Sequence, residues 1–219
     1  MNNLDAIIER IDQHLESKNA AREEVLALSR RIVQHASGVI RAAHRHEWAD
    51  ARATLDDAAG LVAQMHGQTA DQSELYWAGY TQDALKEYAE AHLTLALIED
   101  TALPTPESIQ VEEAAYLNGL AEAASELRRH ILDLVRHNDY DTANRLLEKM
   151  EEIYSRLITI DYPHAITQNL RRTTDQLRGV LERTRGDLTL TMKQEELKHA
   201  LRAVERSITE SRTERDFLS

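Results

Sequence analysis

Apolar residues recur every three or four positions along nearly the whole chain. In one segment the intervals are three, four, three, four and three, at Leu117, Leu120, Ala124, Leu127, Ile131 and Leu134. This spacing is typical of amphipathic helices, because residues three and four apart share one helix face. The 219 residues include only 7 Gly and 3 Pro, too few for the frequent turns of a sheet-rich sandwich or barrel. The sequence therefore predicts an all-α protein.

The periodic segments predict a bundle of about six to seven long helices in a single domain over residues 1–219. Breakers between the segments place the helices at about 4–46, 48–65, 73–98, 106–136, 139–160, 165–185 and 187–208, with a polar tail at about 209–219. The clearest boundaries are Pro104-Thr105-Pro106, Asp161-Tyr162-Pro163 and Gly186-Asp187. Rods of this length leave lateral faces that often pair with copies of themselves, so we expect a homo-oligomer.

Charge and cysteine content restrict the function further. The 38 acidic residues against 26 basic ones give a formal net charge of −12, so binding of a polyanion requires a local basic patch or a metal ion. The absence of Cys excludes disulfides, thiol nucleophiles and Cys-ligated metal sites. Neither a signal peptide nor an apolar run of about 18 residues is visible, so we expect a cytoplasmic protein without membrane contact.

Two pairs of glutamates stand out as candidate metal ligands. Glu87 and Glu90 are three residues apart, and Glu122 and Glu126 are four apart, so each pair projects from one helix face. Glu122 and Glu126 lie roughly 130 to 170° from the centre of the Leu117–Leu134 stripe, so we expect them to face away from the core. Two such pairs on sequential antiparallel helices could form an oxygen-rich cage.

Carboxylates without Cys or clustered His suit a hard ion such as Mg²⁺ or Mn²⁺. Two ions held in this way can activate water against a phosphodiester and stabilise the leaving oxygen. From spacing alone an ordinary solvated helix face is the more common case, because Glu pairs at these intervals are common on helices.

Basic strips interrupt the acidic surface and are candidate nucleic-acid contacts. They include Arg128-Arg129 and Arg171-Arg172, with Tyr76, Trp77 and Tyr80 as possible stacking platforms for bases. The alternative is that these arginines pair with neighbouring glutamates along their own helices.

Four segments resemble the translin family, which includes translin and translin-associated factor X. Glu87-Tyr88-Ala89-Glu90-Ala91 is similar to the Glu-Tyr-Val-Glu-Ala motif of factor X. The segment 116–127, Tyr-Leu-Asn-Gly-Leu-Ala-Glu-Ala-Ala-Ser-Glu-Leu, is similar to the family motif Tyr-Leu-x-Gly-Val-x-Asp-Leu-x-x-Glu-Leu. The segment 26–45 is similar to the family's first helix, and Arg185-Gly186 matches its terminal Arg-Gly. The resemblance extends from about Arg22 to Met192.

The resemblance implies a seven-helix subunit that assembles, usually as an octameric shell, around single-stranded RNA or DNA. In factor X the matching acidic positions form a Mg²⁺-dependent endoribonuclease site, which here implies Glu87, Glu90, Glu122 and Glu126. Glu122 departs from the family's Asp by one methylene. Translin's own basic motif has no counterpart, because the segment 73–80 reads Ser-Glu-Leu-Tyr-Trp-Ala-Gly-Tyr. The chain is therefore more similar to the catalytic partner.

Three functional hypotheses follow. The first is a Mg²⁺-dependent endoribonuclease of the translin family that cuts single-stranded or short RNA, with the four glutamates as metal ligands. The second is a non-catalytic binding protein for single-stranded RNA or DNA that uses the arginine strips. The third is a helical oligomerisation scaffold that binds neither nucleic acid nor a divalent ion.

Overall fold

A computed structural model of the chain describes the backbone of residues 3–216 and the side chains of residues 3–208. The described backbone is helical and contains no strand, which confirms the predicted all-α class. The helices are α1 (Leu4–His44), α2 (Trp48–Thr69), α3 (Ser73–Tyr76), α4 (Gly79–Glu99), α5 (Glu113–Arg136), α6 (Tyr140–Leu157), α7 (His164–Thr167) and α8 (Leu170–Asp216). Six of these are long, while α3 and α7 are single turns.

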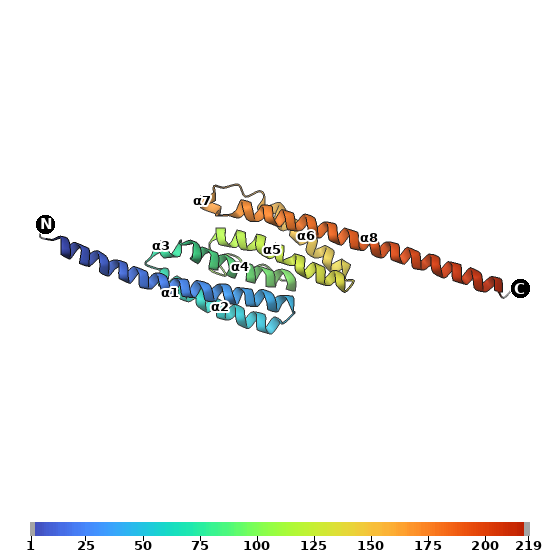
Figure 1. The fold of residues 1–219 in the computed structure, drawn as a ribbon, viewed down its shortest axis with the longest axis horizontal. Coiled ribbons are helices and arrows are strands. Elements are labelled where there is room, and N and C mark those ends of the chain that lie inside the picture. Colours follow the sequence, from blue (N-terminus) through green and yellow to red (C-terminus); the bar gives the residue numbers. More distant parts are fainter. Residues whose placement is uncertain (1–2, 217–219) are drawn as a thin grey trace.

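The helices α4 and α5 lie in the middle of the bundle (Figure 1). Helix α1 packs against α2 and α4, α4 packs against α5, and α5 packs in turn against α6 and α8. Both α4 and α5 therefore have neighbours on two sides. Polar side chains on these helices can be enclosed between helices rather than exposed to solvent.

The core consists mainly of aliphatic and alanine side chains. Along α5, Ala124, Leu127 and Ile131 of the predicted stripe are fully buried, and the stripe's other three members pack against the core while partly exposed. Helix α5 also buries Ala121 and Ala123, which lie outside that stripe. Small side chains at these positions allow neighbouring helices to approach closely on more than one face of α5.

Two predicted helix boundaries differ from the structure. The predicted helix 73–98 is divided into α3 and α4, where the Thr81 hydroxyl donates to the Leu75 carbonyl at 2.7 Å and stabilises the break. The helix predicted from Pro106 begins only at Glu113. The Tyr116 hydroxyl donates to the Pro104 carbonyl at 2.8 Å and attaches the preceding loop to α5. Local periodicity does not report such tertiary contacts.

The predicted break at Gly186-Asp187 is wrong, because α8 continues through it. A single glycine costs a helix only about 1 kcal/mol. The adjacent contacts offset this cost, since Leu188 is buried and the Asp187 carboxylate accepts a hydrogen bond from Arg128 of α5 at 2.7 Å. The predicted polar tail at 209–219 falls at the end of α8, and its side chains lie outside the described residues.

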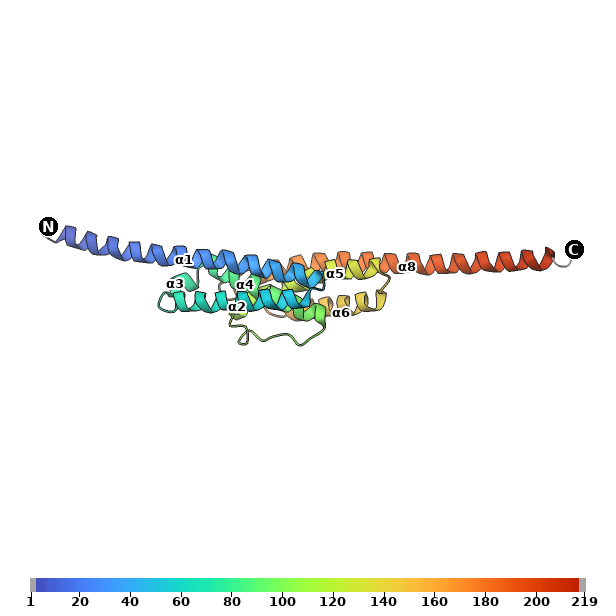
Figure 2. The same cartoon turned by 90° about the horizontal axis from the view of Figure 1, so that it is seen from below.

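Both α1 and α8 extend beyond the body of the bundle, at opposite ends (Figures 1 and 2). Within the described residues, no helix is both long and apolar enough to cross a membrane.

Candidate metal centre

Gly119 brings α5 into near contact with α4. A Cβ atom at this position would lie 2.9 Å from the Glu90 backbone nitrogen and 2.9 Å from the Lys86 carbonyl oxygen. Real Cβ atoms do not approach backbone atoms so closely, so only glycine fits here without a shift of the helices. The side chains of Glu87 and Glu90 on α4 are consequently brought close to Glu122, which follows Gly119 by three residues on α5.

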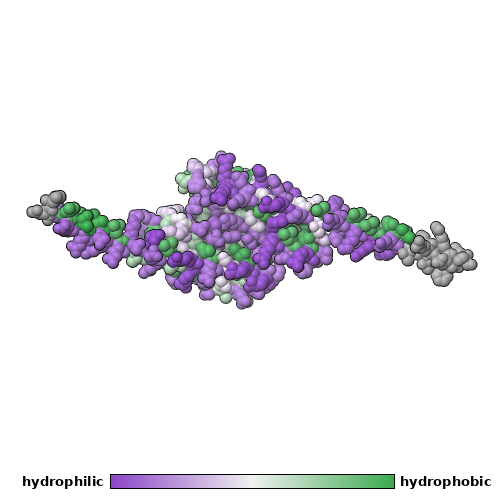
Figure 3. All heavy atoms as spheres, viewed as in Figure 1, coloured by the Kyte–Doolittle hydropathy of each residue, from purple (hydrophilic) through white to green (hydrophobic). Residues whose placement is uncertain are grey.

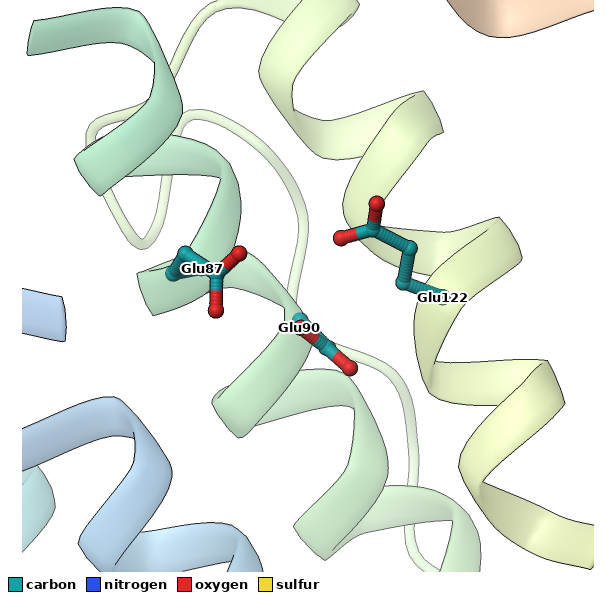
Figure 4. A group of neighbouring side chains, drawn as sticks. All are labelled: Glu87, Glu90 and Glu122. Atoms are coloured by element: carbon teal, nitrogen blue, oxygen red, sulfur yellow. The ribbon is translucent and has the colours of Figure 1, made fainter. Parts of the chain in front are cut away.

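Three of the four predicted glutamates converge between these helices. One carboxylate oxygen from each of Glu87, Glu90 and Glu122 lies within 4.8 Å of the other two. Figure 4 shows the two α4 side chains and the α5 side chain facing the space between the helices. We refer to these three residues as the carboxylate cluster.

The fourth predicted ligand, Glu126, lies outside the carboxylate cluster. Its Oε2 atom is 3.0 Å from Nε2 of His44, near the end of α1. The His44 side chain is buried, and its Nδ1 atom has no hydrogen-bond partner among the described residues. Glu126 is still near enough to raise the pKa of Glu90 by charge repulsion. It therefore occupies the edge of the site, in contact with a histidine.

Lys86 supplies a positive charge to the cluster. Its Nζ atom lies 2.7 Å from the Glu122 carboxylate and 2.9 Å from the Glu87 carboxylate. Burial by itself would lower the pKa of Lys86, but the hydrogen bonds to Glu122 and Glu87 hold that pKa above its ordinary value. Lys86 therefore remains an ammonium ion and offsets part of the repulsion between the carboxylates.

Glu90 is the most buried member of the cluster, with 8% of its surface exposed. Burial, followed by repulsion from Glu87, Glu122 and Glu126, raises the pKa of the Glu90 carboxyl to about 8. Burial also raises the pKa of Glu122, although Lys86 opposes this shift. A cation placed among these oxygens would lower the pKa values of Glu90 and Glu122 again, because its positive charge favours the ionised carboxylates.

The predicted outward orientation of Glu122 and Glu126 requires correction. The side chains of these residues are only 31% and 38% exposed. The prediction assumed that one apolar stripe defines the buried side of α5. Because α5 packs between α4 and the pair α6 and α8, the face opposite the stripe is also an interface.

The raised pKa of Glu90 predicts that the contribution of this carboxyl to the stability of the cation-free protein falls as pH rises from about 4.5 to about 8. Over this range the folded state retains a proton on Glu90 that the unfolded state has released. Burial lowers the pKa of His92 from its ordinary value of 6.5 to about 4. The contribution of His92 to stability therefore rises with pH between about 4 and 6.5, because the unfolded state binds a proton there that the folded state does not. Urea unfolding in EDTA should therefore compare the wild type with Glu90→Gln. The stability difference should shift in favour of the variant as pH rises, and a constant difference would contradict the burial of an ionisable Glu90.

A cleft of about 550 Å³ opens beside the carboxylate cluster. Lys86 and Glu122 form part of its wall, together with Trp77, Asp83 and Arg172. Trp77 is 58% exposed and Arg172 is also exposed. The cleft therefore brings a positive side chain and an aromatic ring to the space that Glu122 of the carboxylate cluster also lines.

The other predicted nucleic-acid contacts do not line this cleft. Arg128 contacts α8, where it donates to the Thr184 hydroxyl at 3.2 Å and to Asp187. Arg129 and Arg171 are exposed. Tyr76 is half-buried, and its hydroxyl donates to the Glu112 carboxylate at 2.7 Å. Among the predicted arginines and aromatic residues, Arg172 and Trp77 are the two that line the cleft.

The carboxylate cluster fits a hard divalent cation. All three donors are carboxylate oxygens, the ligands that Mg²⁺ and Mn²⁺ prefer. They come from two rigid helices, which limits the loss of side-chain and backbone freedom on binding. A bound divalent ion would compete with Lys86 for the oxygens of Glu87 and Glu122.

Three residues of the candidate site were not assigned a role from the sequence. Gly119 lies in the middle of a helix, where glycine is unfavourable, and this could have indicated a close helix contact. Lys86 is adjacent to Glu87 in the sequence, but its contact with Glu122 depends on packing of α4 against α5. No local signal connects His44 with Glu126, which is 82 residues away.

The fold and the site together define an all-helical protein with three facing carboxylates between its two central helices. No family model matches the chain. An uncharacterized protein of Methanocaldococcus jannaschii is 30% identical over 195 residues, covering 88% of this chain and 86% of that protein.

Solved structures of C3PO proteins share this fold. AfC3PO is 31% identical, with a TM-score of 0.78 over 85% of this chain and 97% of that one. A complex of AfC3PO with duplex RNA gives a TM-score of 0.77 with the same identity and coverage. Apo-NeC3PO, at 17% identity and a TM-score of 0.76, shares the fold. The chain belongs to the translin/C3PO family.

Proposed function

We propose that the protein is a Mg²⁺- or Mn²⁺-dependent endoribonuclease that cuts single-stranded or short RNA inside a homo-oligomeric shell, which family resemblance suggests is an octamer. The observation that carries this proposal is the convergence of Glu87, Glu90 and Glu122 within 4.8 Å, beside an open cleft. Membership of the translin/C3PO family supports it, since AfC3PO has been solved with duplex RNA.

The cluster residues have separate roles in this proposal. Glu87, Glu90 and Glu122 would hold the divalent cation, which when bound polarises a phosphodiester and lowers the pKa of water. Glu126 lies at the edge of the cluster, where its carboxylate can accept a proton from an attacking water. His44, at 3.0 Å, orients that carboxylate.

The cleft is suited to hold the RNA strand. Arg172 can contact a phosphate, and the exposed Trp77 ring can stack on a base. These contacts bring the strand to the wall that Glu122 and Lys86 form. The large net negative charge of the chain restricts favourable phosphate contacts to such local positions.

The direct test is incubation of the purified 219-residue chain with labelled single-stranded and duplex RNA. We expect cleavage in Mg²⁺ or Mn²⁺ and none in EDTA. Thermal unfolding without RNA provides a separate readout, because a cation that binds the folded state should raise the Tm. Cleavage that persists in EDTA, or a Tm that is insensitive to Mn²⁺, would contradict the proposal.

The second candidate function is binding of single-stranded RNA or DNA without cleavage. The observation that favours it is the exposure of Arg171 and Arg172, of which Arg172 lines the cleft. This alternative predicts retention of intact oligonucleotides with affinity that decreases steeply with salt. Replacing both arginines with glutamine should reduce the affinity and the salt dependence. Intact RNA after prolonged incubation in Mg²⁺ would favour this alternative over the nuclease.

A further inference from the structure

Lys86 lies at the boundary between the carboxylate cluster and the cleft. Its Nζ atom is 2.7 Å from the Glu122 carboxylate and 2.9 Å from the Glu87 carboxylate, and both of these residues belong to the cluster. The same atom is 3.5 Å from the carboxylate of Asp83, which lies outside the cluster. Lys86 and Asp83 also line the cleft. The ammonium group therefore has partners on both sides of this boundary.

The charge of Lys86 compensates the cluster in the cation-free protein. Within residues 3–208, no other Lys, Arg or His side chain forms an ion pair with Glu87 or Glu122. Carboxylates that are held this close together and partly buried repel one another unless a positive charge lies between them. Lys86 supplies that charge from a neighbouring position on α4.

A divalent cation in the cluster would take the place of the ammonium group. It would lie among the oxygens of Glu87, Glu90 and Glu122, two of which Lys86 contacts in the cation-free protein. Two positive charges at such a short separation repel each other, and partial burial strengthens the repulsion. The lysine side chain can move away, because its ammonium group is carried on a flexible four-carbon stem. The open space beside it is the cleft.

Asp83 offers the displaced ammonium group a partner at the cleft wall. Asp83 precedes Lys86 by three residues on α4, so the two side chains share a helix face. The Asp83 side chain is 65% exposed, and a cation bound in the cluster does not occupy its carboxylate. In this position the ammonium group would face the same cleft as Arg172. Lys and Arg are the usual protein partners of nucleic-acid phosphates.

We propose that Lys86 is an exchangeable counter-ion of the candidate metal centre. Without a divalent cation it neutralises Glu87 and Glu122. When the cation binds, the ammonium group leaves these two carboxylates, keeps its contact with Asp83 and binds a phosphate of the RNA strand in the cleft. The RNA contact rests on the proposed function, whereas the exchange itself depends only on the carboxylate cluster and Lys86.

Lys86→Met tests the exchange in the absence of RNA. We expect the variant to bind Mn²⁺ about 10-fold more tightly than the wild type, because no ammonium group has to be displaced. Isothermal titration calorimetry at about pH 8 measures both affinities, since a lower pH would add competition from the proton on Glu90. Circular dichroism establishes that the variant is folded, and Lys86→Gln takes its place if it is not. Equal or weaker Mn²⁺ binding by the uncharged variant would overturn the proposal.

Two further variants show whether the local charge is the cause. Lys86→Arg retains the positive charge and should bind Mn²⁺ less tightly than Lys86→Met. Lys198→Met changes the net charge of the chain by the same amount as Lys86→Met and should leave Mn²⁺ affinity unchanged. Lys198 is 51% exposed on the part of α8 that projects beyond the body (Figure 3). A gain in Mn²⁺ affinity equal to that of Lys86→Met in either variant would overturn the proposal.

RNA affinity in Mn²⁺ tests the phosphate contact. It is measured as KM where RNA is cleaved and as Kd where RNA stays intact. We expect Lys86→Met to bind RNA more weakly although it binds Mn²⁺ more tightly. The slope of log affinity against log salt should fall by about 1, the value for one phosphate contact. An unchanged slope would overturn this contact.

The two proposals fail separately. Intact RNA after incubation of the wild type with Mn²⁺ would contradict the nuclease and leave the Mn²⁺ titrations of the Lys86 variants as the test of the exchange. Equal Mn²⁺ affinity of wild type and Lys86→Met would contradict the exchange, whatever the outcome of the RNA cleavage assay.

Discussion

Glu90→Gln is expected to reduce divalent-dependent RNA cleavage by about 100-fold or more. Loss of a residue that only supports a metal ligand typically costs 10- to 100-fold, and Glu90 is proposed as a ligand itself. The substitution retains the shape of the side chain and removes its charge. The same variant should be more stable than the wild type without divalent cations at about pH 8, because it no longer buries an ionisable carboxyl.

The two opposite effects distinguish a functional residue from a structural one. Single-turnover cleavage of labelled RNA measures the first effect, and urea unfolding in EDTA measures the second. Glu148→Gln is the matched control, because Glu148 is exposed on α6 and should change neither quantity. A Glu90→Gln protein that cleaves at the wild-type rate would contradict the assignment of the metal centre.

Gly119→Ala is expected to destabilise the fold by about 1–3 kcal/mol, the usual cost of an added methyl group in a packed core. The new Cβ would lie 2.9 Å from backbone atoms of α4, and backbone cannot rotate aside as a flexible side chain can. The strain must separate α4 from α5. Glu122 then moves away from Glu87 and Glu90, so cation binding and cleavage should weaken together with stability.

Gly60→Ala provides the control for Gly119→Ala. Gly60 is exposed on α2, and a Cβ there meets no atom within 4 Å. Alanine should therefore stabilise α2 by up to about 1 kcal/mol through helix propensity alone. Thermal unfolding and Mn²⁺-induced shifts in Tm measure both variants. A Gly119→Ala protein as stable as Gly60→Ala would mean that α4 and α5 do not require the glycine contact.

The sequence predicted the presence of the helices more reliably than the residues at which they begin and end. The three- and four-residue spacing identified the six long helices, because an amphipathic helix is defined by the positions of its own side chains. The helix boundaries predicted at Gly186 and at Pro106 were wrong. In the first case contacts of Asp187 and Leu188 with the bundle maintain the helix, and in the second a tertiary hydrogen bond attaches the loop.

The sequence predicted the residues of the candidate site but not how they are arranged, and the reason is related. Motif resemblance identified Glu87, Glu90, Glu122 and Glu126, and residues at intervals of three or four share a helix face wherever the helix lies. The sequence by itself thus determined the helical class and the residue types that two helix faces present. It did not determine which faces meet.

Only the tertiary structure decided that Glu87, Glu90 and Glu122 converge, that Lys86 lies between two of them, and that Glu126 contacts His44. These relations depend on the approach of α4 to α5 at Gly119 and on the enclosure of α5 between two layers of helices. Contacts between distant segments arise from the packing of the whole core, and local spacing carries no information about that packing.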